Sequence, residues 1–150
     1  MAADKVTNVM CVGIGGQGVL TVSEILSLAA FEAGFDVKKS EVHGMSQRGG
    51  SVTSSVRFGE KVASCLVPEG EIDILLGFEP NETERNRHLV REGGVVIEPT
   101  PELVKACLEM PRTLNVAVLG LASRHLPFSE SDWDKAIELM VPPRTINDNR

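Results

Sequence analysis

Apolar and polar residues follow several different patterns along the chain, and each pattern predicts a type of element. Residues 9–12 are continuously apolar and lead directly into a glycine-rich turn, which predicts a buried strand. Residues 19–33 place apolar side chains around much of a helical circumference, so a largely buried helix is expected, with Gly34 at its C-terminal end. A second strand follows at residues 35–39. Strand, helix and strand within about 30 residues indicate a parallel, right-handed βαβ unit.

The middle of the chain predicts strands of two kinds. In residues 51–58 the apolar side chains Val52, Val56 and Phe58 alternate with polar ones, which is typical of a half-exposed strand in antiparallel pairing. Gly59 and Glu60 can form a two-residue turn, and the chain would then return along residues 62–67 as a hairpin inserted at the edge of the sheet. The continuous apolar run at residues 72–78 predicts a buried central strand.

The last half of the chain alternates helices and strands. A helix is expected from Glu79 to Glu92, with Asn81 as its N-cap, a solvated charged face and Gly93-Gly94 as its end. After it come a strand at 95–97, a short helix at 102–110, a segment at 115–123 that is either strand or helix, and a final helix capped by Ser131 and running to Met140. The sum is one α/β domain over residues 1–150. We expect a three-layer, Rossmann-like, mostly parallel sheet with helices on both faces and an inserted β-hairpin.

Composition narrows the classes of function. A net charge of −6 leaves no basic patch for nucleic acid or an anionic membrane, and no apolar run reaches membrane-spanning length. The three cysteines are widely separated and no C-x-x-C pair occurs, so neither a metal site nor an iron–sulfur cluster is expected in this chain. The N-terminus has no apolar signal segment, which favours a cytoplasmic protein with free thiols.

The first candidate site is the G-x-G-x-x-G turn between the first strand and the first helix. We expect Gly13 to take backbone angles closed to other residues, Gly15 and Gly16 to let a ligand or a neighbouring chain approach, and Gly18 to allow close packing of the helix. Together with Gln17 these residues would lead into free N–H groups that suit phosphate or carboxylate. Glycines at this spacing can equally serve only to turn a strand sharply into a helix.

The second candidate site is the polar loop at residues 41–50. The guanidinium of Arg48, among Ser46, Gln47, Gly49 and Gly50, could bind a carboxylate or phosphate through two parallel hydrogen bonds, or form an ion pair with a partner subunit. Glu41 is the one well-placed acid for the ribose of a dinucleotide, and its alternative role is an ion pair with Lys38, Lys39 or Arg48. His43 has no evident catalytic partner. No nucleophile–base pair, paired carboxylates or metal ligand set can be identified, so no catalytic residue is assigned.

Three sequence strings resemble one family. Gly13-Ile-Gly-Gly-Gln-Gly-Val19, Ser40-Glu-Val-His-Gly-Met-Ser-Gln-Arg-Gly-Gly-Ser-Val52 and Val56-Arg-Phe-Gly59 look like the gamma-type domain of the 2-oxoacid:ferredoxin oxidoreductases, and most of all like the beta subunits of the indolepyruvate enzymes. The second string is long and unusual, so it is much more specific than the glycine motif. The chain departs from the family pattern at Cys65, where proline is usual, and in ending at Arg150.

The resemblance implies a subunit that is inactive alone. Thiamine diphosphate and the [4Fe–4S] clusters would belong to a large partner chain, and the complex would decarboxylate an arylpyruvate oxidatively, acylate coenzyme A and reduce ferredoxin. This chain would contribute residues 15–18 and 46–50 to a shared cleft facing coenzyme A and to the surface that docks the partner. A homodimer is compatible with this assignment. Two other interpretations remain: a free-standing NAD-binding protein, and a non-catalytic homo-oligomeric scaffold that pairs through an exposed hairpin edge.

Overall fold

The computed structural model describes residues 6–15, 18–43, 50–99 and 114–140, although not the side chains of His43, of residues 114–116 or of Met140. The helix expected at 102–110, the C-terminal tail and most of the Arg48 loop lie outside these ranges. The elements in chain order are β1 (Val6–Ile14), α1 (Val19–Glu32), β2 (Asp36–His43), β3 (Ser51–Gly59), β4 (Ile72–Gly77), α2 (Pro80–Asn86), the 3₁₀ turn η2 (Arg87–Leu89), β5 (Val90–Ile97), α4 (Leu114–Ala122), the 3₁₀ turn η4 (Ser123–His125) and α5 (Glu130–Met140).

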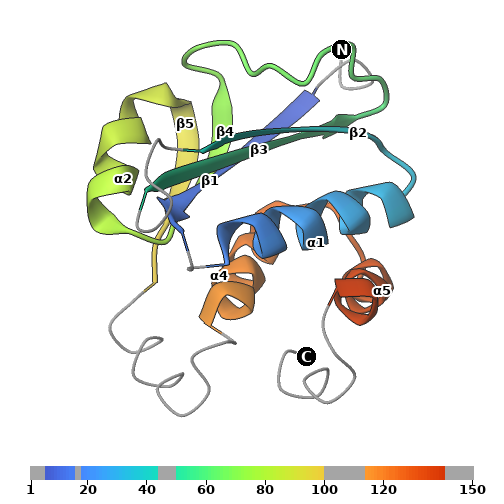
Figure 1. Ribbon diagram of the computed structural model, residues 1–150. Coiled ribbons are helices and arrows are strands. Elements are labelled where there is room, and N and C mark those ends of the chain that lie inside the picture. The colour runs from blue at the N-terminus through green and yellow to red at the C-terminus, as the bar shows by residue number, and fades with distance from the viewer. Residues whose placement is uncertain (1–5, 16–17, 44–49, 100–113, 141–150) are drawn as a thin grey trace.

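The strands form one sheet in the order β2-β3-β1-β4-β5 (Figure 1). The expected α/β class with a βαβ unit is confirmed, but the sheet is mixed where a mostly parallel one was expected. β4 pairs with β1 and β5 in parallel, whereas β3 lies between β1 and β2 and runs antiparallel to both. Because β1 and β2 share a direction, the βαβ unit keeps its geometry but is split by the inserted β3.

The hairpin expected at residues 59–67 is wrong. The chain beyond β3 is irregular, and side chains rather than a strand ladder hold it. The Asp36 carboxylate accepts the Val62 N–H at 2.7 Å, and the Arg57 guanidinium donates to the carbonyls of Ser64 and Leu66 at 2.9 and 2.6 Å. The antiparallel hairpin of this domain is therefore β2–β3. The alternation in residues 51–58 correctly predicted a strand in antiparallel pairing, but its partners are β1 and β2 and not residues 62–67.

Each face of the sheet buries its own apolar cluster. α1, α4 and α5 cover one face (Figure 1). There Phe58 of β3 meets Phe35 and Phe128, with ring centroids 5.2 and 5.0 Å apart. On the opposite face α2 contacts β1 and β4, and a smaller cluster gathers around Val12 and Leu75. Helices thus lie on both faces, with the larger core beneath α1.

The helix ends differ from expectation in three places. Glu79, not Asn81, caps α2, since its carboxylate accepts the Glu82 N–H at 2.7 Å. The helix ends early, and Gly93 lies inside β5, where its φ of +81° coincides with a shift of register. A backbone angle of that sign is open to glycine at little cost.

At the C-terminal end, α5 begins with a reciprocal cap. Ser129 Oγ accepts the Asp132 N–H at 3.2 Å, and the Asp132 carboxylate accepts the Ser129 N–H at 2.9 Å. This pair satisfies two N–H groups at the start of the helix, so Ser129 takes the position expected for Ser131. The ambiguous segment at 115–123 is helical, as α4.

Candidate functional site

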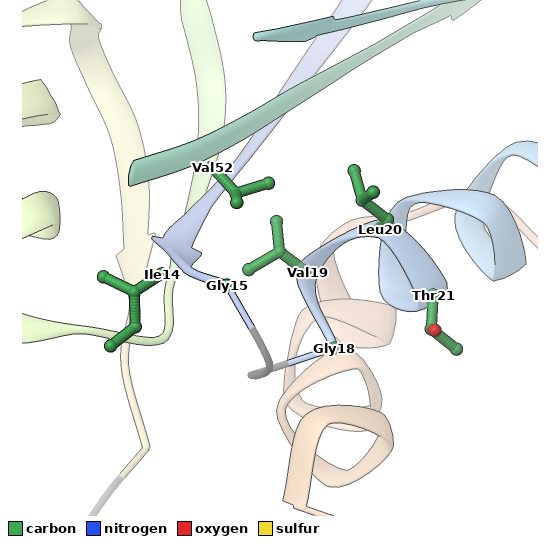
Figure 2. Close-up of a pocket in the computed structure, with 7 residues that line it drawn as sticks. All are labelled: Ile14, Gly15, Gly18, Val19, Leu20, Thr21 and Val52. Atoms are coloured by element: carbon green, nitrogen blue, oxygen red, sulfur yellow. The ribbon is translucent and has the colours of Figure 1, made fainter. Parts of the chain in front are cut away.

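A pocket of about 260 Å³ lies at the carboxyl end of β1, beside the start of α1. Figure 2 shows Ile14 and Gly15 at the end of the strand, Gly18 and Val19 at the start of the helix, and Val52 of β3 above them. Leu20 and Thr21 complete the lining. The carboxyl end of a parallel strand next to a helix start is the usual place for ligands in open α/β sheets.

The start of α1 leaves backbone donors available at this pocket. Gly18 is the N-cap in a left-handed conformation (φ 80°, ψ 20°), and the helix has no side-chain cap and no acidic residue in its first turn. The first N–H to bond within the helix is that of Val22, to the Gly18 carbonyl at 3.0 Å. The N–H groups of Val19 to Thr21 have no intrahelical acceptor, and the helix dipole adds a partial positive charge there.

The residue that needs glycine's conformational freedom is Gly18, whereas Gly13 was expected in that role. Gly13 is buried within β1 opposite Val52, and the described residues with positive φ include Gly18 but not Gly13 or Gly15. Gly15 is exposed at the rim, as the approach of a ligand or chain would require. Gly16 and Gln17 lie outside the described residues.

The two candidate loops meet at this edge of the sheet. The Gly15 N–H donates to the Gly50 carbonyl at 3.0 Å, which joins the glycine turn to the last residue of the Arg48 loop. The loop departs from the end of β2 and returns at the start of β3, both on the side of the sheet where β1 ends. Ser46, Gln47, Arg48 and Gly49 lie between these described ends and are themselves outside the described residues.

A buried carboxylate beside the site was not anticipated. Glu82, assigned from sequence to a solvated helix face, is 8% exposed, and its Oε1 accepts the Ser51 hydroxyl at 2.8 Å and lies 3.3 Å from an Arg85 nitrogen. Ser51 is the first residue of β3, directly after Gly50, so this bond fixes the exit of the Arg48 loop. Nothing in the local pattern around Glu82 could reveal a partner 31 residues away.

The structure argues against Glu41 as a ribose ligand. Glu41 forms an ion pair with Lys39 at 3.2 Å, which confirms the alternative role, and Lys39 also binds Glu24 of α1. In a dinucleotide fold the ribose acid ends the strand next to the first. Here β3 occupies that place, so Glu41 lies two strands from β1, about 10 Å away in the hydrogen-bonding direction.

Cys11 is a buried core thiol at the centre of β1, and burial raises its pKa to about 12. The thiolate is the reactive form, so Cys11 should stay unmodified by iodoacetamide at about pH 8 until the protein is unfolded with denaturant. Mass spectrometry of tryptic peptides measures this, with the half-buried Cys65 as the internal control that reacts in the native protein. Modification of Cys11 at the rate of Cys65 would contradict the expectation.

Among residues 6–15, 18–43, 50–99 and 114–140, no three His, Cys, Asp or Glu side chains gather closely enough to hold a metal ion. No helix in those ranges is long and apolar enough to span a membrane.

Comparison with known proteins points in one direction. A model of the family described as pyruvate ferredoxin/flavodoxin oxidoreductase matches residues 8–105. The indolepyruvate oxidoreductase subunit IorB of Thermococcus kodakarensis is 35% identical over an alignment covering 97% of this chain and 91% of that subunit. IorB of Pyrococcus horikoshii is 33% identical with the same coverage.

Solved structures agree in fold. The 2-oxoglutarate:ferredoxin oxidoreductase from Magnetococcus marinus, with 2-oxoglutarate, coenzyme A and succinyl-CoA bound, superposes with a TM-score of 0.85 at 18% identity. The superposition covers 97% of this chain but only 29% of that one. The gamma subunit of a keto/oxoacid ferredoxin oxidoreductase from Geobacter sulfurreducens gives a TM-score of 0.77 at 22% identity and is covered over 91% of its length.

Proposed function

Because the chain belongs to the pyruvate ferredoxin/flavodoxin oxidoreductase family, we propose that it is the gamma-type subunit of an indolepyruvate or arylpyruvate enzyme of that family. In this proposal it is a single domain, is inactive alone, and works in the cytoplasm with a large subunit that carries thiamine diphosphate and [4Fe–4S] clusters and reduces ferredoxin. Its own contribution is a cleft facing coenzyme A and a surface that docks the large subunit.

One observation supports this role more than any other: the Gly15 N–H donates to the Gly50 carbonyl, so the described ends of the glycine turn and of the Arg48 loop are joined next to the pocket. Had the loops lain on opposite sides of the sheet, no shared cleft could form. In the proposed arrangement, with both loops at one edge, the free N–H groups of α1 and the guanidinium of Arg48 would act on the same ligand.

The residues at this edge fit a ligand such as coenzyme A, which joins anionic phosphates to a long uncharged arm. The uncapped N–H groups of residues 19–21 suit a phosphate oxygen, and Arg48 can add a charge-assisted pair of bonds. The aliphatic side chains of Ile14, Val19, Leu20 and Val52 give the uncharged arm an apolar wall. The thioester chemistry would occur on the partner chain, while this chain would hold and orient the co-substrate.

The test of the site is Arg48→Ala in the complex reconstituted with the thiamine-containing large subunit. Losing a charge-assisted bond of about 1.5–3 kcal/mol should raise the KM for coenzyme A roughly 10- to 100-fold. The KM for the 2-oxo acid should stay near the wild-type value, because its pocket lies on the partner in this proposal. Initial rates of ferredoxin reduction at varied coenzyme A give both constants.

Arg87→Ala is the matched control, because Arg87 is an exposed arginine that pairs with Glu84 and Glu98 and does not line the pocket. It should leave both KM values unchanged. An Arg48→Ala complex with an unaltered KM for coenzyme A would refute the role of Arg48. Failure of the wild-type chain to support any arylpyruvate-dependent reduction with its large subunit would refute the wider assignment.

A further inference from the structure

The two edges of the sheet are built differently. β5 is interrupted by the register shift at Gly93, and its exposed Arg91 and Glu92 flank that irregularity, a common way to prevent pairing with another chain. β2 has no such irregularity. Its eight residues pair with β3 in unbroken register from Asp36 to His43, and it contains neither proline nor a bulge. Its outer side therefore presents a regular row of backbone donors and acceptors.

Exposed apolar side chains lie along this edge. Val42 near the end of β2 is 64% exposed, and Phe31 of α1 is 68% exposed. Phe31 follows Glu24 by two helical turns and so lies on the same side of α1, and Glu24 binds Lys39 of β2. The side of α1 that borders β2 thus adds an unburied aromatic ring to the edge. Val42 is three residues from Lys39 and so points away from α1, which leaves one large apolar side chain exposed on each side of the β2 edge.

The charges along β2 favour pairing with a second copy of this chain in one particular register. We propose that a second copy of this chain docks on β2 with its own β2 antiparallel, about a two-fold axis at Ser40, so that the sheet continues from one copy into the other. In that register Ser40 faces its symmetry mate and Lys39 faces Glu41 of the second copy, twice by symmetry.

Neighbouring registers are unfavourable. Centring the axis on Lys38, Lys39 or Glu41 would set each of those residues against its own copy, with like charges directly opposite. Shifting the second strand by a single residue would place the buried face of one copy's β2 on the same side of the continued sheet as the exposed face of the other copy's β2. The lysines that would normally protect an edge strand thus exclude the wrong alignments and leave the Ser40 alignment available.

The proposed register can be tested by a single cysteine in the full-length chain. Directly opposite residues have Cα atoms about 4.5–5.5 Å apart, within the range that a disulfide spans. Ser40→Cys should therefore form a disulfide-linked dimer under mild oxidation, and peptide mapping should show the two introduced thiols joined. Val42→Cys is the matched control, because its two copies would be four residues out of register, about 13 Å apart. Wild-type protein under the same oxidation reports any dimer formed by the natural cysteines.

Sedimentation equilibrium over a range of concentrations tests the same surface without oxidation. Wild-type protein should self-associate to a dimer, and Glu41→Lys should raise the dimer dissociation constant about tenfold by setting lysine against Lys39. Glu84→Lys on exposed α2 makes the same change of charge and should leave the constant unchanged. A wild-type chain that stays monomeric, equal crosslinking through Val42→Cys, or insensitivity to Glu41→Lys would each overturn the proposal. Protection of the β2 amides only by the large subunit would assign the edge to that subunit instead. None of these outcomes depends on coenzyme A binding.

Discussion

Replacing Phe58 by alanine is expected to lower the free energy of unfolding by about 4 kcal/mol. Phe58 is 1% exposed on the inserted strand β3, and its ring contacts Phe35 at the start of β2 and Phe128 before α5. Truncation removes the apolar contacts of the ring, leaves a cavity that the strand cannot close, and breaks two aromatic pairs worth about 0.5–1.5 kcal/mol each beyond their burial. The loss is large because this ring links the sheet to the C-terminal helix.

Urea unfolding followed by far-UV circular dichroism measures this change. Leu66→Ala is the matched control, since Leu66 is 70% exposed and its removal should alter stability by no more than about 0.5 kcal/mol. The pocket at the start of α1 is lined by other residues, so Phe58→Ala protein that remains folded should give the wild-type KM for coenzyme A in the test proposed for Arg48. A stability loss below about 1 kcal/mol would mean that the aromatic cluster repacks.

Gly77→Ala is expected to cost about 3 kcal/mol through crowding rather than a cavity. A Cβ at Gly77 would lie 1.9 Å from Thr83 Oγ1 and 2.9 Å from Thr83 Cβ. Thr83 cannot yield easily, because it is fully buried and its hydroxyl donates to the Glu79 carbonyl at 2.8 Å. The methyl group would push α2 away from β4 and carry with it Glu82, which holds the start of β3.

The same unfolding experiment includes two comparisons. Gly120→Ala introduces the same methyl group where no atom lies within 4 Å of the new Cβ, in the exposed part of α4, and should stabilise the protein by about 0.5–1 kcal/mol. Thr83→Ala combined with Gly77→Ala removes the two closest atoms but not Thr83 Cβ, so it should recover part of the loss. If the double variant is no more stable than the sum of the single changes predicts, the clash is not the cause.

Local sequence patterns predicted the elements whose side chains pack on immediately neighbouring elements. The helix of residues 19–32 and the strand of residues 72–77 are where their apolar spacing placed them, because each buries its side chains on immediate neighbours. The position of β3 could not be predicted, since alternation indicates an antiparallel partner but does not say which strands flank it. The false hairpin has a specific cause: Arg57 supplies hydrogen bonds to a segment that was expected to find them in a ladder.

The candidate site divides in the same way. Strand direction brings the ends of β1 and β2 and the start of β3 to one edge of the sheet, where the Gly15 N–H donates to the Gly50 carbonyl. The burial of Glu82 could not be anticipated, because a charged residue on a short helix is normally solvated, and one of the two described partners of its carboxylate, Ser51, is 31 residues away in the chain.

The place of β1 in the middle of the sheet has a consequence for biosynthesis. β1 leaves the ribosome before both of its neighbours, β3 and β4, which end at Gly59 and Gly77. At a translation rate of about 5–20 residues per second, its apolar side chains wait several seconds for a partner. A nascent chain arrested before β3 has emerged from the exit tunnel should therefore recruit holding chaperones, and one arrested after β4 has emerged should release them.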